Sequence, residues 1–107
     1  MRELTKHEEL ILLSTWRLKD NAYGVTIRKK ILEITEKTIN YGSLCNTLYL
    51  LVRRGFIKPR DSNPESIQGG RRKVLYNLTP EGKKALITAY EVQKSTWNGF
   101  SELAFEE

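Results

Sequence analysis

Apolar residues recur at helical spacing in the N-terminal part of the chain. Thr5 is followed three residues later by Glu8, the capping-box pattern that satisfies free backbone N–H groups where a helix begins. The apolar positions after this cap are spaced like one side of a helix: Leu10, Leu13, and Ile11 or Trp16. We therefore predict a first helix over residues 6–18, with Leu10 and Leu13 on its apolar stripe.

Two more helices are predicted before Gly55. One spans roughly residues 24–36 and places its isoleucines on a single stripe: Ile27, Ile31 and Ile34. The next begins after Asn40, a residue type favoured at the N-cap, and its leucines fall at i, i+4 and i+7: Leu44, Leu48 and Leu51. Gly55 follows two arginines and is expected to end this helix, because glycine readily adopts the left-handed conformation that closes many helices.

The apolar period changes after Gly55. The segment "FIKPR" is short and apolar, and "RKVLYNL" alternates, with Val74, Tyr76 and Leu78 on one face. Between them lies "DSNPESIQGG", whose Asp, Ser, Asn, Pro and Gly residues are typical of a loop. The pattern predicts a two-stranded hairpin over about residues 56–78. Three helices followed by such a hairpin form a winged helix-turn-helix, in which the hairpin is the wing.

A last helix is predicted from Thr79 onward, because Thr79 suits the N-cap and Pro80 suits the first helical position. We expect it to continue to about residue 104, which is more than a core of this size can cover. Its apolar residues share a side and, together with a tryptophan of the first helix, predict a partner surface: Leu86, Tyr90, Trp97, Phe100, Leu103 and Trp16. Dimerisation is the favoured interpretation, and direct contact of Trp97 with a ligand is a second one.

The chain of 107 residues is long enough for one modest core. The expected fold class is mainly α with a small β-hairpin. We expect a winged helix-turn-helix DNA-binding domain over residues 1–79, with the wing at about 56–78, and a C-terminal dimerisation helix over residues 80–107. Part of the stability is expected to come from self-association.

Charge is distributed unevenly along the chain. The net charge is +5, but residues 53–84 hold nine Lys and Arg against three acids, whereas residues 91–107 hold one lysine against four acids. A basic middle and an acidic end indicate a polyanion-facing surface set apart from a different surface. Three consecutive cations follow two glycines at the predicted wing tip: Arg71, Arg72 and Lys73. They can contact phosphate, and the glycines favour this by letting the backbone approach closely. A phosphate-binding P-loop is disfavoured because these glycines precede a strand.

The face of the third helix opposite its leucines is polar. It and its flanks carry side chains that can hydrogen-bond base edges or phosphates: Tyr41, Ser43, Asn46, Thr47, Tyr49 and Arg53. Asn46 is the sharpest candidate, because an asparagine amide pairs bidentately with adenine. Two alternatives stay open from the sequence, a solvated polar face and sideways packing of Tyr49.

Few residues are available for other chemistry. The single cysteine, Cys45, excludes an internal disulfide, and with one histidine, His7, a His/Cys zinc site is not expected. No Ser/His/Asp, Cys/His or paired-carboxylate arrangement stands out, so we expect neither an enzyme nor a cofactor. No apolar run approaches the ~20 residues of a membrane span, and no signal-peptide pattern opens the chain. We therefore expect a cytoplasmic protein with no membrane partner.

Two stretches together resemble the PadR family of bacterial transcriptional regulators: "YGSLCNTLYLLVRRGFI" and "GGRRKVLYNLTPEGKKAL". In that family a helix reading roughly S-P-G-T-L-Y-P-x-L-x-x-L-x-x-x-G-L-I precedes a wing of the form G-G-R-x-R/K-x-Y-x-L-T-x-x-G. The residues that fall on the first pattern are Asn40, Gly42, Ser43, Leu44, Leu48, Leu51, Gly55 and Ile57. Those on the second are Gly69, Gly70, Arg71, Lys73, Tyr76, Leu78, Thr79 and Gly82. The resemblance covers about residues 8–90.

The chain departs from the family pattern at four positions. Proline is common in the family where this chain has Tyr41, Asn46 or Arg72, and tyrosine is usual where it has Cys45. Because Cys45 and Asn46 lie on the presumed recognition helix, the operator sequence read by relatives is not carried over.

The resemblance implies a homodimeric transcription factor, usually a repressor. Its third helix would enter the major groove of double-stranded DNA, its wing tip would touch the flanking backbone or minor groove, and its last helix would pair with the partner's first helix. Short-tailed members, which this chain resembles in length, often repress efflux-transport genes and bind flat hydrophobic compounds between the subunits. A small hydrophobic or aromatic effector is therefore implied. The rival hypothesis is a winged-helix protein-interaction module that never binds DNA.

Overall fold

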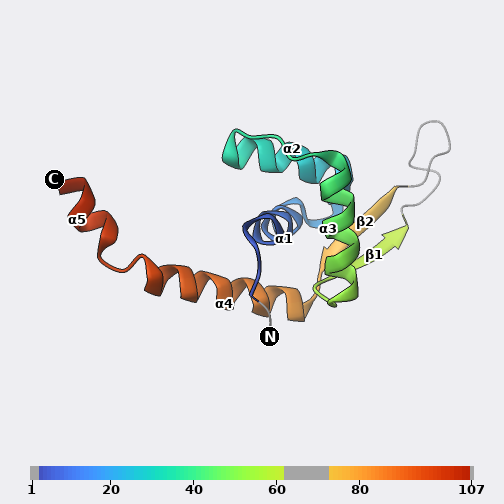
Figure 1. Ribbon diagram of the computed structural model, residues 1–107. Coiled ribbons are helices and arrows are strands. Elements are labelled where there is room, and N and C mark those ends of the chain that lie inside the picture. Colours follow the sequence, from blue (N-terminus) through green and yellow to red (C-terminus); the bar gives the residue numbers. More distant parts are fainter. Residues whose placement is uncertain (1–2, 62–72, 107) are drawn as a thin grey trace.

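The computed structural model describes residues 3–61 and 73–106 (Figure 1). The elements in chain order are α1 (Lys6–Leu18), the 3₁₀ turn η1 (Lys19–Asn21), α2 (Gly24–Thr35), α3 (Tyr41–Arg53), β1 (Ile57–Asp61), β2 (Val74–Leu78), α4 (Pro80–Thr96) and α5 (Phe100–Glu106). The first three helices and the hairpin form one body, and α4 leads away from it to α5 (Figure 1). The predicted order of three helices, a hairpin and a further helical segment is confirmed.

α1 begins at the predicted cap. The Thr5 hydroxyl accepts a hydrogen bond from the Glu8 N–H at 3.1 Å, and the Glu8 carboxylate accepts one from the Thr5 N–H at 2.7 Å. The predicted apolar stripe meets the core only in part: Ile11 is 0% exposed and Leu10 packs half-buried against the core, whereas Leu13 is 39% exposed. The residues that α1 buries are Glu8, Ile11, Leu12, Ser14 and Thr15. This face also has helical spacing, but it includes a carboxylate and two hydroxyls, which a search for apolar residues overlooks.

α2 and α3 form the helix-turn-helix pair. Ile27 and Ile31 are buried as predicted, whereas Ile34 is 42% exposed because it lies near the C-terminal end of α2, beyond the last core residue. α3 begins after Asn40, whose side chain accepts a hydrogen bond from a first-turn N–H at 3.1 Å. Its three predicted core leucines are 0–2% exposed: Leu44, Leu48 and Leu51. Gly55, with a φ of +79°, follows the helix as predicted.

The two strands pair antiparallel, from Ile57 opposite Leu78 to Asp61 opposite Val74. The predicted hairpin is therefore present. β1 buries Ile57 and exposes its other residues. On β2, Tyr76 and Leu78 pack half-buried against the core as expected for one face, but Val74 at the outer end is 44% exposed. The predicted wing tip, including Arg71 and Arg72, lies outside the described residues.

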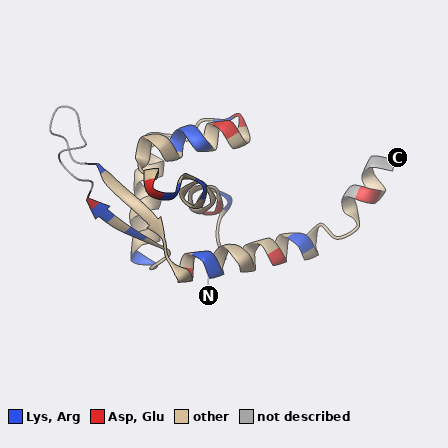
Figure 2. Ribbon diagram, turned by 180° about the vertical axis from the view of Figure 1, so that it is seen from behind, with Lys and Arg blue, Asp and Glu red and all other residues tan. Residues whose placement is uncertain are grey.

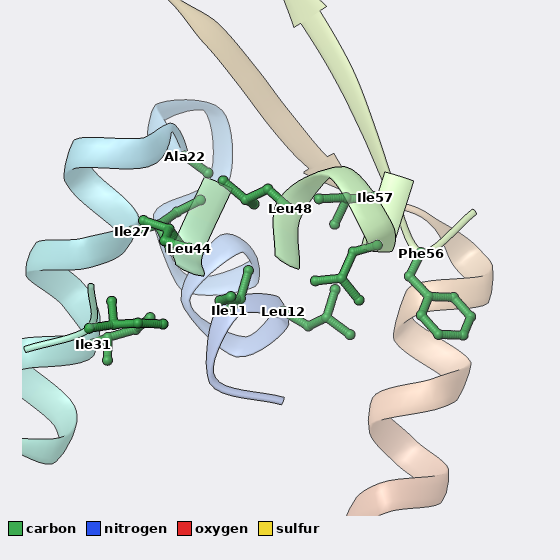
Figure 3. Close-up of a cluster of buried hydrophobic side chains, with 11 residues drawn as sticks. Ile11, Leu12, Ala22, Ile27, Ile31, Leu44, Leu48, Phe56 and Ile57 are labelled. Carbon is green, nitrogen blue, oxygen red and sulfur yellow. The ribbon is translucent and has the colours of Figure 1, made fainter. Parts of the chain in front are cut away.

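The hydrophobic core lies where α1, α2, α3 and the base of the hairpin meet (Figure 3). Its members are Ile11, Leu12, Ala22, Ile27, Ile31, Ile39, Leu44, Leu48, Leu51, Phe56 and Ile57. Figure 3 shows the side chains of the three helices pointing toward one another, with Phe56 beside the start of α4. Because the leucine face of α3 packs in the core, the opposite face of this helix is exposed to solvent.

The prediction of one continuous helix to about residue 104 is wrong. α4 ends at Thr96, and α5 begins at Phe100. Between them Gly99 has a φ of +80°, a left-handed conformation that glycine adopts without steric cost and that interrupts the helix. The predicted N-cap is confirmed, since the Thr79 hydroxyl accepts a hydrogen bond from the Gly82 N–H at 3.0 Å. A single long dimerisation helix is thus replaced by two helical segments.

Candidate nucleic-acid interface

α3 presents a mainly polar face to solvent while its leucines hold the other face in the core. The exposed side chains of this helix include Tyr41, Ser43, Cys45, Asn46, Tyr49, Leu50 and Arg53, and Thr47 is half-buried beside them. The structure therefore brings together the residues of α3 that the sequence put forward for DNA contact, with Thr47 at the margin. Cys45 and Leu50 were not among those residues.

Tyr49 and Arg53 form a pair on successive turns of α3. The Arg53 Nη1 donates a hydrogen bond to the Tyr49 hydroxyl at 3.1 Å, and the guanidinium carbon lies 5.8 Å from the tyrosine ring centroid. Tyr49 remains 58% exposed, so it does not pack sideways into the body. A guanidinium has more donors than one hydroxyl can accept from, and it suits phosphate or guanine. The pair therefore directs a cation toward solvent near the C-terminal end of α3.

Tyr41 lies at the joint between α2 and α3. A Cβ added at Gly24 would lie 2.7 Å from the Tyr41 hydroxyl oxygen, so the tyrosine packs directly on the start of α2. Partial burial raises the pKa of Tyr41, and the neighbouring thiol of Cys45 raises it further. Burial likewise raises the pKa of Tyr76 on β2, with smaller effects of Cys45 and Tyr41. Both hydroxyls thus remain neutral donors at neutral pH.

The hairpin contributes further cations. Lys58 and Arg60 are exposed on β1, and Lys73 is exposed just before β2. Lys58 and Arg60 were missed as site candidates, although they alternate with Ile57 and Pro59 and so must share the other face of the strand. Figure 2 shows cations on β1 near those at the end of α3. The described part of the wing therefore carries positive charge of its own.

A partly buried ion pair fixes the end of α3. The Arg54 Nη1 lies 2.9 Å from the Glu8 carboxylate, and the two side chains are 20% and 5% exposed. The Arg54 guanidinium also lies 4.6 Å from the ring centroid of Phe56. Sequence reasoning missed this contact because no local spacing relates residues in α1 to residues after α3. It ties the presumed recognition helix to α1.

Three residues of the predicted partner surface line one cavity between α1 and α4. The cavity has a volume of about 320 Å³ and is lined by Leu13, Trp16, Leu78, Lys83, Leu86, Ile87 and Tyr90. Trp16 and Tyr90 are 47% and 64% exposed, so the cavity opens onto an apolar surface. Leu13 belongs to this surface, which explains the apolar stripe that the sequence pattern placed on α1.

Trp97 lies elsewhere, in a second cavity of about 370 Å³ that α4 forms with the N-terminal segment and Phe56. Its ring meets the ring of Phe100 edge to face, with 5.4 Å between centroids and an interplanar angle of 88°. On α5, Phe100 and Leu103 are 55% and 68% exposed. The residues predicted to form one stripe are therefore divided between two cavities and α5, and the turn at Gly99 separates α5 from α4.

Two other kinds of site are absent from the described ranges. None of the helices there is both long enough and apolar enough to cross a membrane. Nor do the described His, Cys, Asp and Glu residues gather in a group of three or more that could hold a metal ion.

Solved structures of other proteins share this arrangement. A PadR family transcription regulator from Clostridium difficile R20291 is 26% identical, with a TM-score of 0.69, over 95% of this chain and 97% of that chain. RosR of H. salinarum, in the complex hsRosR-SG, is also 26% identical, with a TM-score of 0.69 over 92% of this chain and 80% of that one. A transcriptional regulator from Clostridium thermocellum shares the fold, at 24% identity and a TM-score of 0.73 over 90% and 87%. No curated protein matches the chain.

A family match agrees with these structures. The family described as "Transcriptional regulator PadR-like family" matches residues 12–88. This range begins in α1, contains α2, α3 and both strands, and ends within α4, so it includes both stretches whose residues resemble that family. The chain belongs to the PadR-like family of transcriptional regulators.

Proposed function

We propose that the protein is a cytoplasmic, homodimeric repressor that binds specific double-stranded DNA and is released by a small hydrophobic effector. Residues 1–79 bind the DNA, and residues 80–107 supply the dimer contacts. The observation that carries this proposal is the two-sided character of α3. Its leucines are held in the core, while Asn46, Tyr49 and Arg53 face solvent on the other side.

In this proposal α3 lies in the major groove, which is wide enough for an α-helix. The hydroxyl and amide groups of Ser43, Asn46 and Thr47 read base edges. Phosphates are contacted from α3 by Tyr41, Tyr49 and Arg53, and from the wing by the cations Arg71, Arg72 and Lys73. The positive charge on β1 and the pairing of Arg53 with Tyr49 support this division of roles.

A dimer would present two copies of α3 to successive half-sites, about 34 Å apart on B-DNA. The apolar surface between α1 and α4 supports an interface there, because Trp16, Leu86 and Tyr90 lie together and leave aromatic area uncovered. On α5, the exposed side chains of Phe100 and Leu103 would add to this dimer interface. Each contact would occur twice, as in other two-fold dimers.

The effector proposal has support from the cavities along α4. Their volumes of about 320 and 370 Å³ fall at the lower end of the range of small-molecule sites, roughly 300–1,000 Å³. Both are lined by aromatic rings, Trp16 and Tyr90 in one and Phe56 and Trp97 in the other. A flat apolar molecule bound beside α4 would favour a dimer geometry in which the two α3 helices no longer match the half-sites.

Duplexes recovered by repeated selection from a random pool provide the test. Binding should fall steeply with salt, by about 10³-fold or more between about 50 and about 200 mM if six or more phosphates are contacted. Asn46→Ala should reduce the preference for the selected duplex over random DNA by about ten-fold or more. Asn98→Ala, at an exposed asparagine in the turn after α4, is the matched control and should change nothing.

Two further readouts locate the contact. Cys45 is exposed on α3 and is the single cysteine of the chain, so a maleimide labels this helix alone. The selected duplex should protect it from labelling, and anilinonaphthalene sulfonate, a flat apolar fluorophore, should bind and lower the DNA affinity. Affinity that is absent or independent of salt would instead support the protein-interaction module, and an unprotected Cys45 would remove α3 from the interface.

A further inference from the structure

β2 is hydrogen-bonded beyond its partner strand. The Tyr76 N–H donates to the carbonyl of Ala22 at 2.8 Å. Ala22 follows η1 and is 0% exposed, so this bond joins the hairpin to the core of the helical body. The segment 20–23, between α1 and α2, therefore lies beside β2.

Two cations of the hairpin reach the same segment. The Lys73 Nζ donates to the Tyr23 hydroxyl at 3.3 Å and lies 4.4 Å from the centroid of its ring. The Arg60 Nη2 donates to the backbone carbonyl of Asp20 at 3.2 Å and lies 3.8 Å from its carboxylate. The Arg60 Nε donates to Asn77 on the neighbouring strand at 2.9 Å. Both arms of the hairpin are thus tied to residues 20–23.

The segment that receives these contacts is itself fixed. Tyr23 is the N-cap residue of α2, and its N–H donates to the Thr26 hydroxyl at 3.0 Å. That hydroxyl donates in turn to the carbonyl of Asn21 at 2.6 Å. The residue beneath Lys73 is therefore the same one at which the helix-turn-helix pair begins.

Few other contacts of the described residues fix the direction of the outer hairpin. Residues 58–61 of β1 are exposed, and so is Val74, which pairs with Asp61, whereas Leu75, Tyr76 and Asn77 are half-buried. A two-stranded hairpin is marginally stable in water when nothing packs against it. The contacts to Tyr23 and Asp20 are then the main described restraint on the direction of its outer end.

We propose that Tyr23 and Asp20 are positioning residues for DNA recognition. They hold the wing at a fixed angle to α3, Tyr23 through Lys73 and Asp20 through Arg60. This inference rests on the proposed DNA-binding function. A wing held in place beforehand loses less conformational freedom when DNA binds, and so the complex is tighter.

The first test needs no DNA. Amide hydrogen exchange is measured in the wild type, Tyr23→Phe and Tyr23→Ala. Phenylalanine keeps a ring beneath Lys73, so its exchange should resemble that of the wild type. Alanine should speed exchange at Leu75, whose N–H points toward β1, while the α3 core amides near Leu48 stay protected and show that the fold is intact. Unchanged exchange at Leu75 in Tyr23→Ala would overturn the inference, whether or not the protein binds DNA.

The second test measures affinity for the selected duplex. Tyr23→Ala should weaken binding about two- to five-fold, the size expected for an exposed cation–π contact. If Tyr23 acts through Lys73, the same substitution should have no effect in a Lys73→Gln background. Lys94→Gln removes the same charge from the exposed face of α4 and controls for net charge.

The changes in DNA affinity among these variants distinguish a positioning role of Tyr23 from the alternatives. Loss in Tyr23→Ala, near-wild-type binding by Tyr23→Phe and non-additivity with Lys73→Gln support a positioning role. An equal loss from Tyr23→Ala in both backgrounds overturns it, because Tyr23 would then act independently of Lys73. If the wild type binds no duplex, the proposed function fails, and hydrogen exchange alone decides whether Tyr23 fixes the hairpin.

Discussion

Ser14 carries a buried hydroxyl whose hydrogen bonding differs from that of its neighbour. It is 0% exposed, and its oxygen has no hydrogen-bond partner among the described residues. The neighbouring Thr15 is buried as well, but its hydroxyl donates to the carbonyl of Ile11 at 2.7 Å. Two adjacent hydroxyls on one helix are therefore in opposite energetic situations.

We predict that Ser14→Ala stabilises the protein. An unsatisfied buried polar group costs about 1–3 kcal/mol, and alanine is the better helix former. The free energy of unfolding should rise by about 1 kcal/mol, measured as a higher denaturant midpoint at an unchanged m-value. Thr15→Ala is the matched control and should lower it, because a satisfied hydroxyl and a buried methyl are lost together. A lower stability for Ser14→Ala would mean that the hydroxyl is satisfied in solution.

α1 also shows what residue patterns leave undecided. The stripe predicted there comprises Leu10, Leu13, and Ile11 or Trp16. Ile11 lies in the core, whereas Leu13 and Trp16 line the open cavity next to α4. The core face contains Glu8 and Thr15, whose polar atoms are satisfied by Arg54 and a backbone carbonyl. Spacing finds apolar faces, but it cannot tell which face meets the core of the same chain.

At the scale of elements, α4 is joined to α3 through the turn between α3 and β1. The Thr79 hydroxyl donates to the carbonyl of Gly55 at 2.6 Å, and the Thr79 N–H donates to that of Phe56 at 3.1 Å. A Cβ added at Gly82 would lie 2.1 Å from the Phe56 carbonyl oxygen. Because this neighbour is backbone, it cannot move aside as a flexible side chain would.

Gly82→Ala should therefore destabilise the protein, although glycine to alanine inside a helix usually stabilises by about 1 kcal/mol. Overpacking against backbone reverses the sign, and we expect the free energy of unfolding to fall by about 2 kcal/mol. Gly99→Ala is the control, since nothing lies within 4 Å of its added Cβ and its cost comes from the left-handed φ of +80° alone. Equal stability of Gly82→Ala and the wild type would show that α4 can shift on the turn.

The elements that sequence reasoning predicted well are those whose signals are local. The caps at Thr5, Asn40 and Thr79 form within three residues of their partners, so residue order alone reveals them. The break before α5 was missed because apolar spacing seemed to continue across Gly99, although Asn-Gly is a strong turn signal. The contact of Lys73 with Tyr23 joins residues far apart in the chain, and only the fold brings them together.

At the scale of the whole molecule, the protein is elongated. Its extents are 57 × 29 × 22 Å and its radius of gyration is 15.9 Å, against about 13 Å for a compact chain of this length. The length comes from α4 and α5, which leave the body (Figure 1). Exposed apolar residues lie along this extension: Ile87, Tyr90, Val92, Trp97, Phe100 and Leu103. An extension of this composition is stable in water when a second surface covers it.

We predict that Tyr90→Asp prevents dimer formation without unfolding the chain. Tyr90 is 64% exposed, so the substitution leaves the core intact, but in a dimer it would bury a carboxylate against apolar side chains. The wild type should sediment as a dimer at micromolar concentration and the variant as a monomer with an unchanged circular dichroism spectrum. DNA affinity should fall by about 10²-fold or more, because the two half-sites are no longer bound by one linked pair. Ser95→Asp adds the same charge at an exposed position of α4 outside both cavities and should remain dimeric. A wild-type chain that sediments as a folded monomer would instead mean that the exposed apolar residues of α4 and α5 meet another partner.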